Sequence, residues 1–248
     1  MKVNRTIERA IEVLSLLSKE KKGLNIKELL EIMQIPKTSL YDILETLVFL
    51  EMIEKDFNEQ NRYKIGIKSF QIGNSYSGNR ELFSLIKKPM QELAERTNNT
   101  VFFAVENNHE IVYMSKFEPE KAIITTSNVG STNPMYCTSL GKAILSFSPE
   151  SKMKQMIDSQ SYVKKTSFTL SKNELLKEVE TIKQRGYAID NREVEEHMLC
   201  IGAPIFNHNK EVVGAISISN LYSENRNIEE EAAELLKTTQ EISRKLGC

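Results

Sequence analysis

The 248-residue sequence has no tryptophan, only three histidines and only three cysteines. Cys137, Cys200 and Cys248 are an odd number, lie far apart and include no CxxC pair, which argues against a disulfide framework and against a zinc site. The histidines are too scattered for a metal cluster, and the Gly-Lys pair in SLGKA lacks the spacing of a phosphate-binding loop. We therefore expect reduced thiols, no metal and no cofactor.

A long apolar run is also missing. No stretch approaches the roughly 18 apolar residues that a membrane helix needs. Residues 1–17 carry Arg9 and Glu12 among their apolar side chains, which indicates an amphipathic helix and not a secretory signal. These features predict a cytoplasmic protein with no membrane partner.

Nor does the sequence have an excess of charge of either sign. The formal net charge is -1, and a division after residue 75 gives a net charge of +1 for the first part and -2 for the remainder. Bulk charge therefore identifies no polyanionic partner, and any argument for DNA rests on the positions of individual residues. The apolar content of 40% and the charged content of 27% are those of an ordinary globular protein, and the length suits two domains.

Two amphipathic helices are predicted in the first 35 residues. The first carries an apolar stripe over residues 7–17 and has Gly23 available as its stop. The second begins after Asn25, a residue type that caps helices, and Glu28 follows three residues later. This spacing is typical of a capping box, in which each side chain accepts a hydrogen bond from the other residue's backbone.

A third helix is predicted almost immediately afterwards, with Pro36 in its first turn and an apolar stripe over residues 40–48. Two strand-like stretches then flank a polar turn at residues 58–61, the pattern of a small hairpin. This order of elements is that of a winged helix-turn-helix, whose third helix enters the major groove of DNA. A plain helical subdomain is the alternative that the same pattern allows.

The polar side of the third helix supplies the candidate DNA contacts, which are Lys37, Thr38, Ser39, Tyr41 and Asp42. Hydroxyls and amides at a helix start bind phosphate, and Thr, Tyr and Asp side chains can contact base edges. Arg62 and Lys64, on the return strand of the hairpin, suit the flanking phosphates. Asp42 is either a specificity element that accepts a hydrogen bond from cytosine N4 or a carboxylate neutralised by Lys37 or another neighbour.

The remaining chain alternates between strand and helix patterns. Residues 66–80 are interpreted as a partly helical connection between two domains. Strands are predicted in TVFFAVE, EIVYMSKFE, AIITTS, YAID, MLCIGAPIF and EVVGAISIS, and helices in ELFSLIKKPMQELAERTNN, LGKAILSF, SKMKQMI, SKNELLKEVETIKQRG and NIEEEAAELLKTTQEISRKL. Antiparallel strands mixed with helices in this way predict an α+β domain and not a doubly wound sheet.

Several segments together form a recognisable pattern: RAIEVLSLL, IPKTSLYDILETLVFLEMIEKD and RYKIG, then NPMYCTSLGKAILS, RGYAIDNREVEEHMLCIGAPIFN and VVGAISIS. By these segments the chain resembles the IclR family of bacterial transcriptional regulators over essentially its whole length. The resemblance implies an N-terminal winged helix-turn-helix at residues 1–65, a linker helix at 66–80 and a C-terminal GAF-like effector-binding domain with an antiparallel sheet at 81–248. It further implies a homodimer or a dimer of dimers that binds double-stranded operator DNA.

The chain also departs from the family pattern. Asp42 stands where an arginine is usual in the recognition helix, so the usual phosphate contact is not expected there. His197 in EEHMLC occupies a position where glycine is common. The stretch SISNLYSENR lacks the usual Gly-Pro after the last core strand, which affects that loop and not the fold.

A small organic acid is the expected effector. The helix that begins at Thr138, Ser139 and Leu140 offers unpaired amides and the positive end of its dipole, which suit a carboxylate. By the resemblance, the residues that line the effector pocket are Ser139, Leu140, Asp190, Met198, Cys200, Ser217 and Ser219. In AISIS the two serines alternate with isoleucines and share one face of a strand, although strand serines that merely face solvent have the same pattern.

Two other functions compete with a sensor. An enzyme with a Cys-His nucleophile is conceivable from Cys200 and His197, but their odd spacing along a strand puts them on opposite faces. We therefore expect no catalytic residue and treat Cys200 as pocket wall. Asp190 is a poor direct partner for a carboxylate unless it is protonated or bridged by water, and would otherwise accept a ligand hydroxyl or orient a loop. The second domain could also serve only to dimerise the protein.

Overall fold

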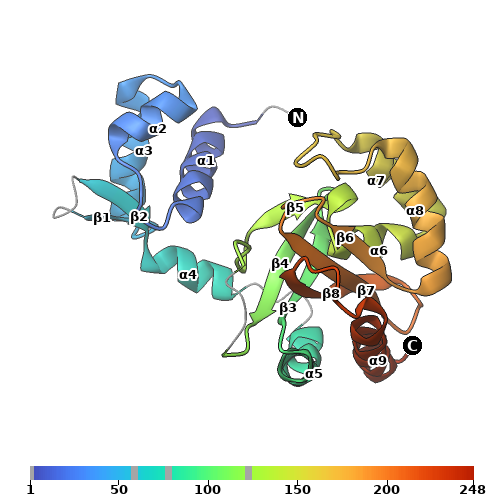
Figure 1. The fold of residues 1–248 in the computed structure, drawn as a ribbon. Coiled ribbons are helices and arrows are strands. Elements are labelled where there is room, and N and C mark those ends of the chain that lie inside the picture. The colour runs from blue at the N-terminus through green and yellow to red at the C-terminus, as the bar shows by residue number, and fades with distance from the viewer. Residues whose placement is uncertain (1–2, 57–60, 76–79, 121–124) are drawn as a thin grey trace. The chain divides into compact units, whose positions relative to one another are not determined.

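The computed structural model describes residues 3–56, 61–75, 80–120 and 125–248. The chain divides into two compact units, Met1–Gly78 and Asn79–Cys248, and each has its own hydrophobic core (Figure 1). Most of the predicted polar turn at residues 58–61, part of the predicted linker at 66–80 and part of the predicted strand at 122–127 lie outside the described residues.

The N-terminal unit has the predicted order of a winged helix-turn-helix. It contains α1 (Arg5–Lys19), α2 (Ile26–Met33), α3 (Lys37–Phe49), β1 (Ile53–Asp56), β2 (Arg62–Ile65) and α4 (Ile67–Asn74). The strands β1 and β2 pair antiparallel, with Ile53 opposite Ile65. The winged helix-turn-helix is thereby confirmed, and α4 lies within the residues interpreted as the linker.

Local chemistry accounts for the tight turn between α2 and α3. Asn25 and Glu28 form the predicted capping box at the start of α2, and Gln34 ends that helix in the left-handed conformation at φ 50°. Pro36 stands directly before α3 and favours its first turn. Leu29 and Leu40, one from each helix, are fully buried in the core that the two helices share. These constraints leave the start of α3 at the surface.

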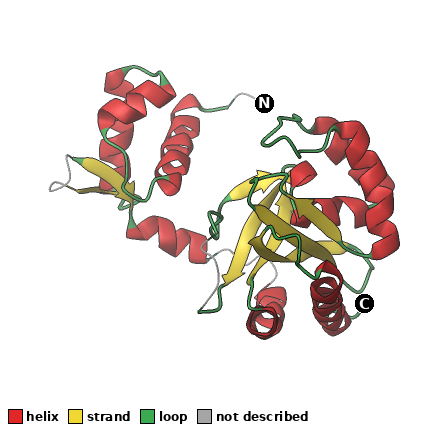
Figure 2. Cartoon of the chain, viewed as in Figure 1, coloured by secondary structure: helices red, strands yellow, loops and turns green. Residues whose placement is uncertain are grey.

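The C-terminal unit is an α+β domain built on one antiparallel sheet, as predicted (Figure 2). Its strands are β3 (Thr100–Asn107), β4 (Glu110–Phe117), β5 (Thr132–Pro134), β6 (Ala188–Asn191), β7 (Met198–Phe206) and β8 (Val212–Leu221), in the spatial order β5-β4-β3-β8-β7-β6. Its helices are α5 (Arg80–Thr97), the short 3-10 turn η1 (Met135–Cys137), α6 (Ser139–Phe147), α7 (Glu150–Ser159), α8 (Lys172–Arg185) and α9 (Ile228–Lys245). Figure 2 shows helices against both faces of the sheet.

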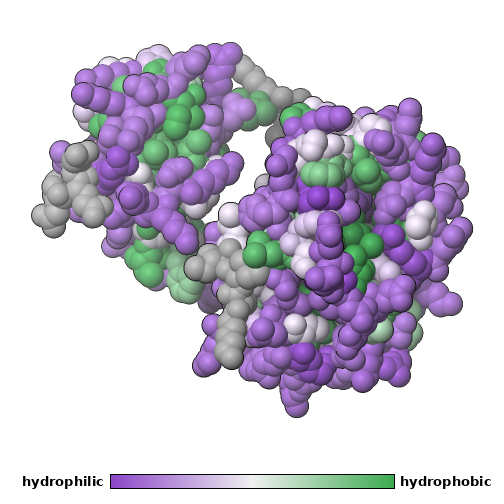
Figure 3. All heavy atoms as spheres, viewed as in Figure 1, coloured by the Kyte–Doolittle hydropathy of each residue, from purple (hydrophilic) through white to green (hydrophobic). Residues whose placement is uncertain are grey.

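Strand alternation sends residues to two separate cores. Ile216 and Ile218 pack with α5 and α9, whereas Ala215 on the other face packs with α6, α7 and α8. Ser217 and Ser219 share the face of Ala215, because side chains two apart on a strand point the same way. Hydrophilic residues cover most of the visible surface of both units (Figure 3).

One strand prediction was wrong over its described part. Residues 125–127, the described end of AIITTS, belong to no strand, and the edge of the sheet is formed by β5, which pairs with β4 through Thr132 and Val112. The pattern missed β5 because it has three residues and ends in Pro134, whereas strand patterns are read over four to eight residues.

Candidate functional site

The start of α3 presents a polar face to solvent. Lys37, Thr38, Tyr41 and Asp42 are exposed, and Ser39 is half-buried, where it accepts a hydrogen bond from Arg9 Nη1 at 3.2 Å. Pro36 provides no side-chain cap. The first amides of α3 therefore remain available to an anion at the positive end of the helix dipole.

Asp42 is not neutralised by Lys37. The Lys37 ammonium lies 5.7 Å from the centre of the Tyr41 ring, and Asp42 makes no ion pair with any residue that the structure describes. Of the two interpretations of Asp42 left open by the sequence, neutralisation by Lys37 therefore has no support in the geometry. Glu45, one turn further along the same face, is also exposed.

The two hairpin cations are engaged inside the N-terminal unit. Arg62 donates to both carboxylate oxygens of Glu28, at 2.8 and 3.0 Å, and to the carbonyl of Gly23 at 2.7 Å. Lys64 lies 3.1 Å from Asp56 on the partner strand. Arg62 thus ties the hairpin to α2, a role that the sequence did not reveal because Glu28 was assigned only to the capping box. A DNA contact of Arg62 or Lys64 stays a prediction.

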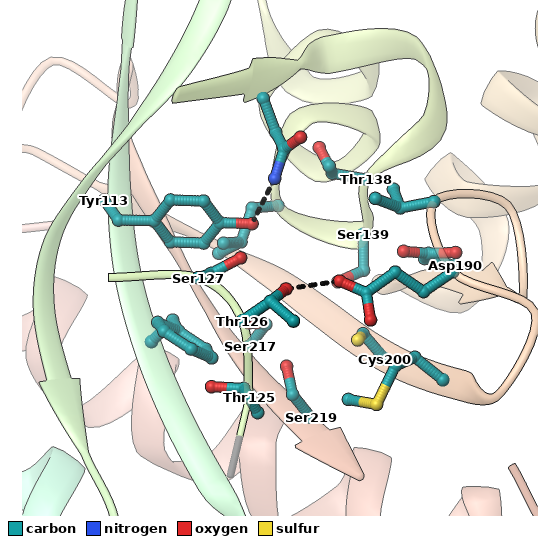
Figure 4. A pocket seen from close by; sticks show the side chains of 16 residues that line it. Tyr113, Thr125, Thr126, Ser127, Thr138, Ser139, Asp190, Cys200, Ser217 and Ser219 are labelled. Carbon is teal, nitrogen blue, oxygen red and sulfur yellow. Dashed lines mark hydrogen bonds between the residues drawn. The ribbon is translucent and has the colours of Figure 1, made fainter. Parts of the chain in front are cut away.

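The C-terminal unit contains a pocket over the face of the sheet that carries Ser217 and Ser219 (Figure 4). The lining residues are Phe102, Tyr113, Thr125, Thr126, Ser127, Asn133, Thr138, Ser139, Leu140, Asp190, Val194, Glu195, Met198, Cys200, Ser217 and Ser219. Among them are all seven residues that the resemblance implied. They come from α6, β6, β7 and β8, so the fold brings together side chains up to 80 residues apart in the sequence.

Strand register arranges the pocket floor in two rows. In one row Asp190, Cys200 and Ser219 lie opposite one another on β6, β7 and β8. In the next, Gly202 lies opposite Ser217. A Cβ on Gly202 would be 2.5 Å from the carbonyl oxygen of Ser139, so the absence of a side chain lets α6 begin directly on the sheet.

The first two residues of α6 line the pocket. Thr138 caps the helix: its hydroxyl accepts the amide of Gly141 at 3.0 Å, and its carbonyl accepts that of Lys142 at 2.9 Å. The cap and this first helical bond leave the amides of Ser139 and Leu140, which both line the pocket, as the donors at the helix start. This arrangement favours a negative charge in the pocket.

Three buried ionisable residues interact with one another here: Asp190, which lines the pocket, and Lys142 and Glu193, which do not. Lys142 is 1% exposed and pairs with Glu193, and Asp190 Oδ1 accepts the amide of Glu193 at 2.8 Å. Burial raises the pKa of Asp190 to about 7, although the Lys142 charge opposes the shift. Burial likewise raises the pKa of Glu193, again against Lys142. One lysine thus faces two carboxyl groups, and Asp190 is partly protonated near neutral pH.

Two loops meet over the pocket. Thr126 donates a hydrogen bond to the Glu195 carboxylate, and Asn133 Nδ2 donates to the Tyr113 hydroxyl at 3.3 Å (Figure 4). The loop that carries Glu195 is held from outside by Arg192, whose guanidinium carbon lies 3.8 Å from the ring centre of Phe168 and 4.0 Å from that of Tyr222. These hydrogen bonds and cation–ring contacts hold the wall of the pocket in place.

The family comparisons agree with this geometry. A family model described as the bacterial transcriptional regulator IclR C-terminal matches residues 74–247, and the IclR helix-turn-helix domain matches residues 6–56. The chain belongs to the IclR family. It is an IclR-type transcriptional regulator with an N-terminal DNA-binding domain.

Relatives of this IclR-family chain cover nearly all of its length. The regulator XynR of Escherichia coli is 28% identical over 224 residues, which are 90% of this chain and 88% of XynR. The crystal structure of Thermotoga maritima IclR has 30% identity and a TM-score of 0.77, and the match covers 98% of this chain and 99% of that one. An IclR homologue from Microbacterium hydrocarbonoxydans, complexed with 4-hydroxybenzoate, has a TM-score of 0.84 at 15% identity and covers 97% and 98%. The last match shows a shared fold.

The thiols of this IclR chain near the pocket are poor nucleophiles. Burial raises the pKa of Cys200 and of Cys137 to about 12, so both are protonated at neutral pH. His197 precedes β7, is exposed and lies 3.2 Å from Glu195. Within the described residues no three potential ligands gather to hold a metal, and none of the helices is both long and apolar enough to span a membrane.

The sequence did not single out the pocket residues Phe102, Tyr113, Thr125 and Thr126. The alternation of residues along the predicted strands could have suggested that these two aromatic residues share one face of the sheet with the serines. In the structure Phe102 lies opposite Ser217 on the neighbouring strand. Thr125 and Thr126 belong to the segment misassigned as a strand. No local pattern predicts that residues 125–127 line a pocket over the sheet.

Proposed function

We propose that this IclR-type regulator binds operator DNA as a homodimer or a dimer of dimers, and that a small, carboxylate-bearing metabolite in the C-terminal pocket changes its affinity for that DNA. The observation that carries the effector assignment is the pocket at the start of α6, which is lined by polar side chains and by Ser139 and Leu140, the first residues of that helix. Carboxylates bind such helix starts because partial positive charge and hydrogen-bond donors coincide there.

The DNA-binding part of the proposal uses the start of α3. We propose that Lys37, Thr38 and Ser39 contact phosphates and that Tyr41 and Asp42 contact base edges. The exposure of four of these side chains and the uncapped helix start support the assignment. A single unit with little net charge binds DNA weakly, and two copies on paired half-sites compensate for this.

The effector acts only through a difference in affinity. A ligand that binds one arrangement of the dimer more tightly than another shifts the protein toward that arrangement, and such coupling is typically about 1 to 3 kcal/mol. Operator affinity should therefore change by roughly 5- to 150-fold on saturation with the effector.

A panel of small organic acids tests the proposal, each paired with its uncharged amide of the same size. The acid should raise the unfolding temperature and shift the retention of a promoter fragment in gels, whereas the amide should do neither. Ser217→Ala combined with Ser219→Ala should weaken the response to the acid and leave binding of the ligand-free protein to DNA unchanged. Ser223→Ala, outside the pocket, is the control. Acids that leave both readouts unchanged would contradict the assignment.

The two alternatives predict different outcomes. An enzyme would consume the acid that binds, which chromatography of the incubated acid detects. A pure dimerisation scaffold would bind none of the panel while its DNA affinity depends on protein concentration. The raised thiol pKa values disfavour the Cys-His enzyme, because a protonated thiol at pH 7 cannot attack a substrate.

A further inference from the structure

The pocket contains a buried hydroxyl that is unpaired within the described part of the chain. Thr125 is 9% exposed, and its Oγ1 has no hydrogen-bond partner among the described residues. Buried hydroxyls are as a rule paired, because an unpaired one loses its hydrogen bonds to water without replacement. An unpaired, buried hydroxyl that lines a pocket therefore indicates a polar group that enters the pocket.

Two serines of the floor also lack a strong hydrogen-bond partner, although their hydroxyls are not among the fully buried unpaired atoms. Ser219 shares a hydrogen bond only with the thiol of Cys200, a weak partner, and no hydrogen bond of the Ser217 hydroxyl is found within the described chain. Other pocket hydroxyls are occupied: Thr126 donates to Glu195, and Thr138 caps α6. The pocket wall thus contains both paired hydroxyls and hydroxyls without a partner among the described residues, and the latter include Ser139 at the start of α6.

These hydroxyls extend away from the start of α6. Ser217 lies in the row of Gly202, on which α6 begins, whereas Ser219 lies one row further, beside Cys200. Residues two apart on a strand are roughly 7 Å apart. In Figure 4, Thr125 and Ser219 are drawn at one end of the pocket, and Thr138 and Ser139 at the other. A ligand anchored at α6 reaches Thr125 only with its opposite end.

We propose that Thr125, Ser217 and Ser219 form a hydroxyl-binding subsite, and that the effector is a hydroxylated organic acid with a hydroxyl group remote from its carboxylate. The inference rests on the proposed function, since it takes the carboxylate at the start of α6 as given. Each protein hydroxyl both donates and accepts, so the three side chains match a ligand hydroxyl, which does the same. A hydrocarbon at this position leaves them unpaired.

Two pairs of probes test the subsite by calorimetry on the full chain: 4-hydroxybenzoate against benzoate, and gluconate against hexanoate. Within at least one pair the hydroxylated acid should bind about tenfold or more tightly, which corresponds to about 1.4 kcal/mol. Thr125→Val should remove most of this preference and change the affinity for the unhydroxylated acid by less than about twofold, because valine keeps the shape of threonine. Thr125→Ser should restore the preference.

The outcomes separate the subsite from the proposed function. Unhydroxylated acids that bind as well as their partners, or a preference that survives in Thr125→Val, would overturn the subsite and leave the acid effector intact. If neither member of either pair binds, the carboxylate assignment and the subsite both fail. The unfolding temperature of ligand-free Thr125→Val should not fall, because the substitution removes an unpaired hydroxyl; this measurement excludes misfolding as the cause of a lost preference.

Discussion

Asp190→Asn should change how the stability of the effector unit depends on pH. Asp190 is 4% exposed, and burial raises its pKa from 3.8 to about 7. The charged groups that face it are Lys142, which favours ionisation, and Glu193, which opposes it. Asparagine keeps the acceptor for the amide of Glu193 and carries no charge at any pH.

The sign and size of the effect follow from proton linkage. Between pH 3.8 and about pH 7 the folded chain holds a proton on Asp190 that the unfolded chain has lost. Because the folded state binds this extra proton, the free energy of unfolding decreases as pH rises through that window. Above about pH 7 Asp190 adds no further pH dependence. At about 1.4 kcal/mol per pH unit, wild type should lose about 3 kcal/mol between pH 5 and pH 8 relative to Asp190→Asn.

Urea unfolding followed by circular dichroism at pH 5, 6, 7 and 8 measures this difference. Asp190→Asn should gain on wild type progressively up to about pH 7 and no further. Asp158→Asn, at an exposed aspartate that pairs with Lys172, is the matched control and should stay within about 1 kcal/mol of wild type throughout. A difference between wild type and Asp190→Asn that is the same at pH 5 and pH 8 would refute the burial argument.

Three further predictions concern other parts of the chain. Asp42→Asn should strengthen binding to unrelated DNA and relax base preference at one operator position, as measured by gel shifts at several salt concentrations; unchanged preference would remove Asp42 from the base contacts. Arg62→Ala should lower the urea midpoint of the N-terminal unit, because Glu28 and the Gly23 carbonyl lose their partner, and an unaltered midpoint would contradict that role. Gly141→Ala should unfold the effector unit at a lower temperature, since a Cβ there would be 2.3 Å from Met135 Cα; equal melting temperatures would mean that η1 can move.

The N-terminal fold was predictable because its signals are local. Asn25 and Glu28 are three residues apart, and their capping box depends on little besides that spacing. The apolar stripes of the helices likewise depend only on the spacing of nearby residues. The ion pair of Arg62 with Glu28 joins residues 34 apart, and no local pattern predicts which carboxylate a hairpin arginine will reach.

The pocket was predictable in part. Its seven expected residues followed from a family resemblance, and the shared face of Ser217 and Ser219 followed from strand alternation. Thr125 was missed because its role depends on a segment folding back over the sheet without forming a strand. The buried charge of Lys142 was also missed, since a lysine in an amphipathic helix is expected at the surface. Its burial is tolerable because its ammonium donates to the Glu193 carboxylate, 51 residues later, and to the Ile189 carbonyl.

The raised pKa of Asp190 resolves a conflict within the proposed function. No lysine or arginine is among the described residues that line the pocket, whereas Asp190 and Glu195 are. An ionised Asp190 would repel a carboxylate bound at the amides of Ser139 and Leu140. Because the pKa of Asp190 is already about 7, a nearby anion would raise it further, and the neutral acid could donate a hydrogen bond to the ligand. An acidic pocket can therefore hold an acid, provided that the site takes up a proton as the ligand binds.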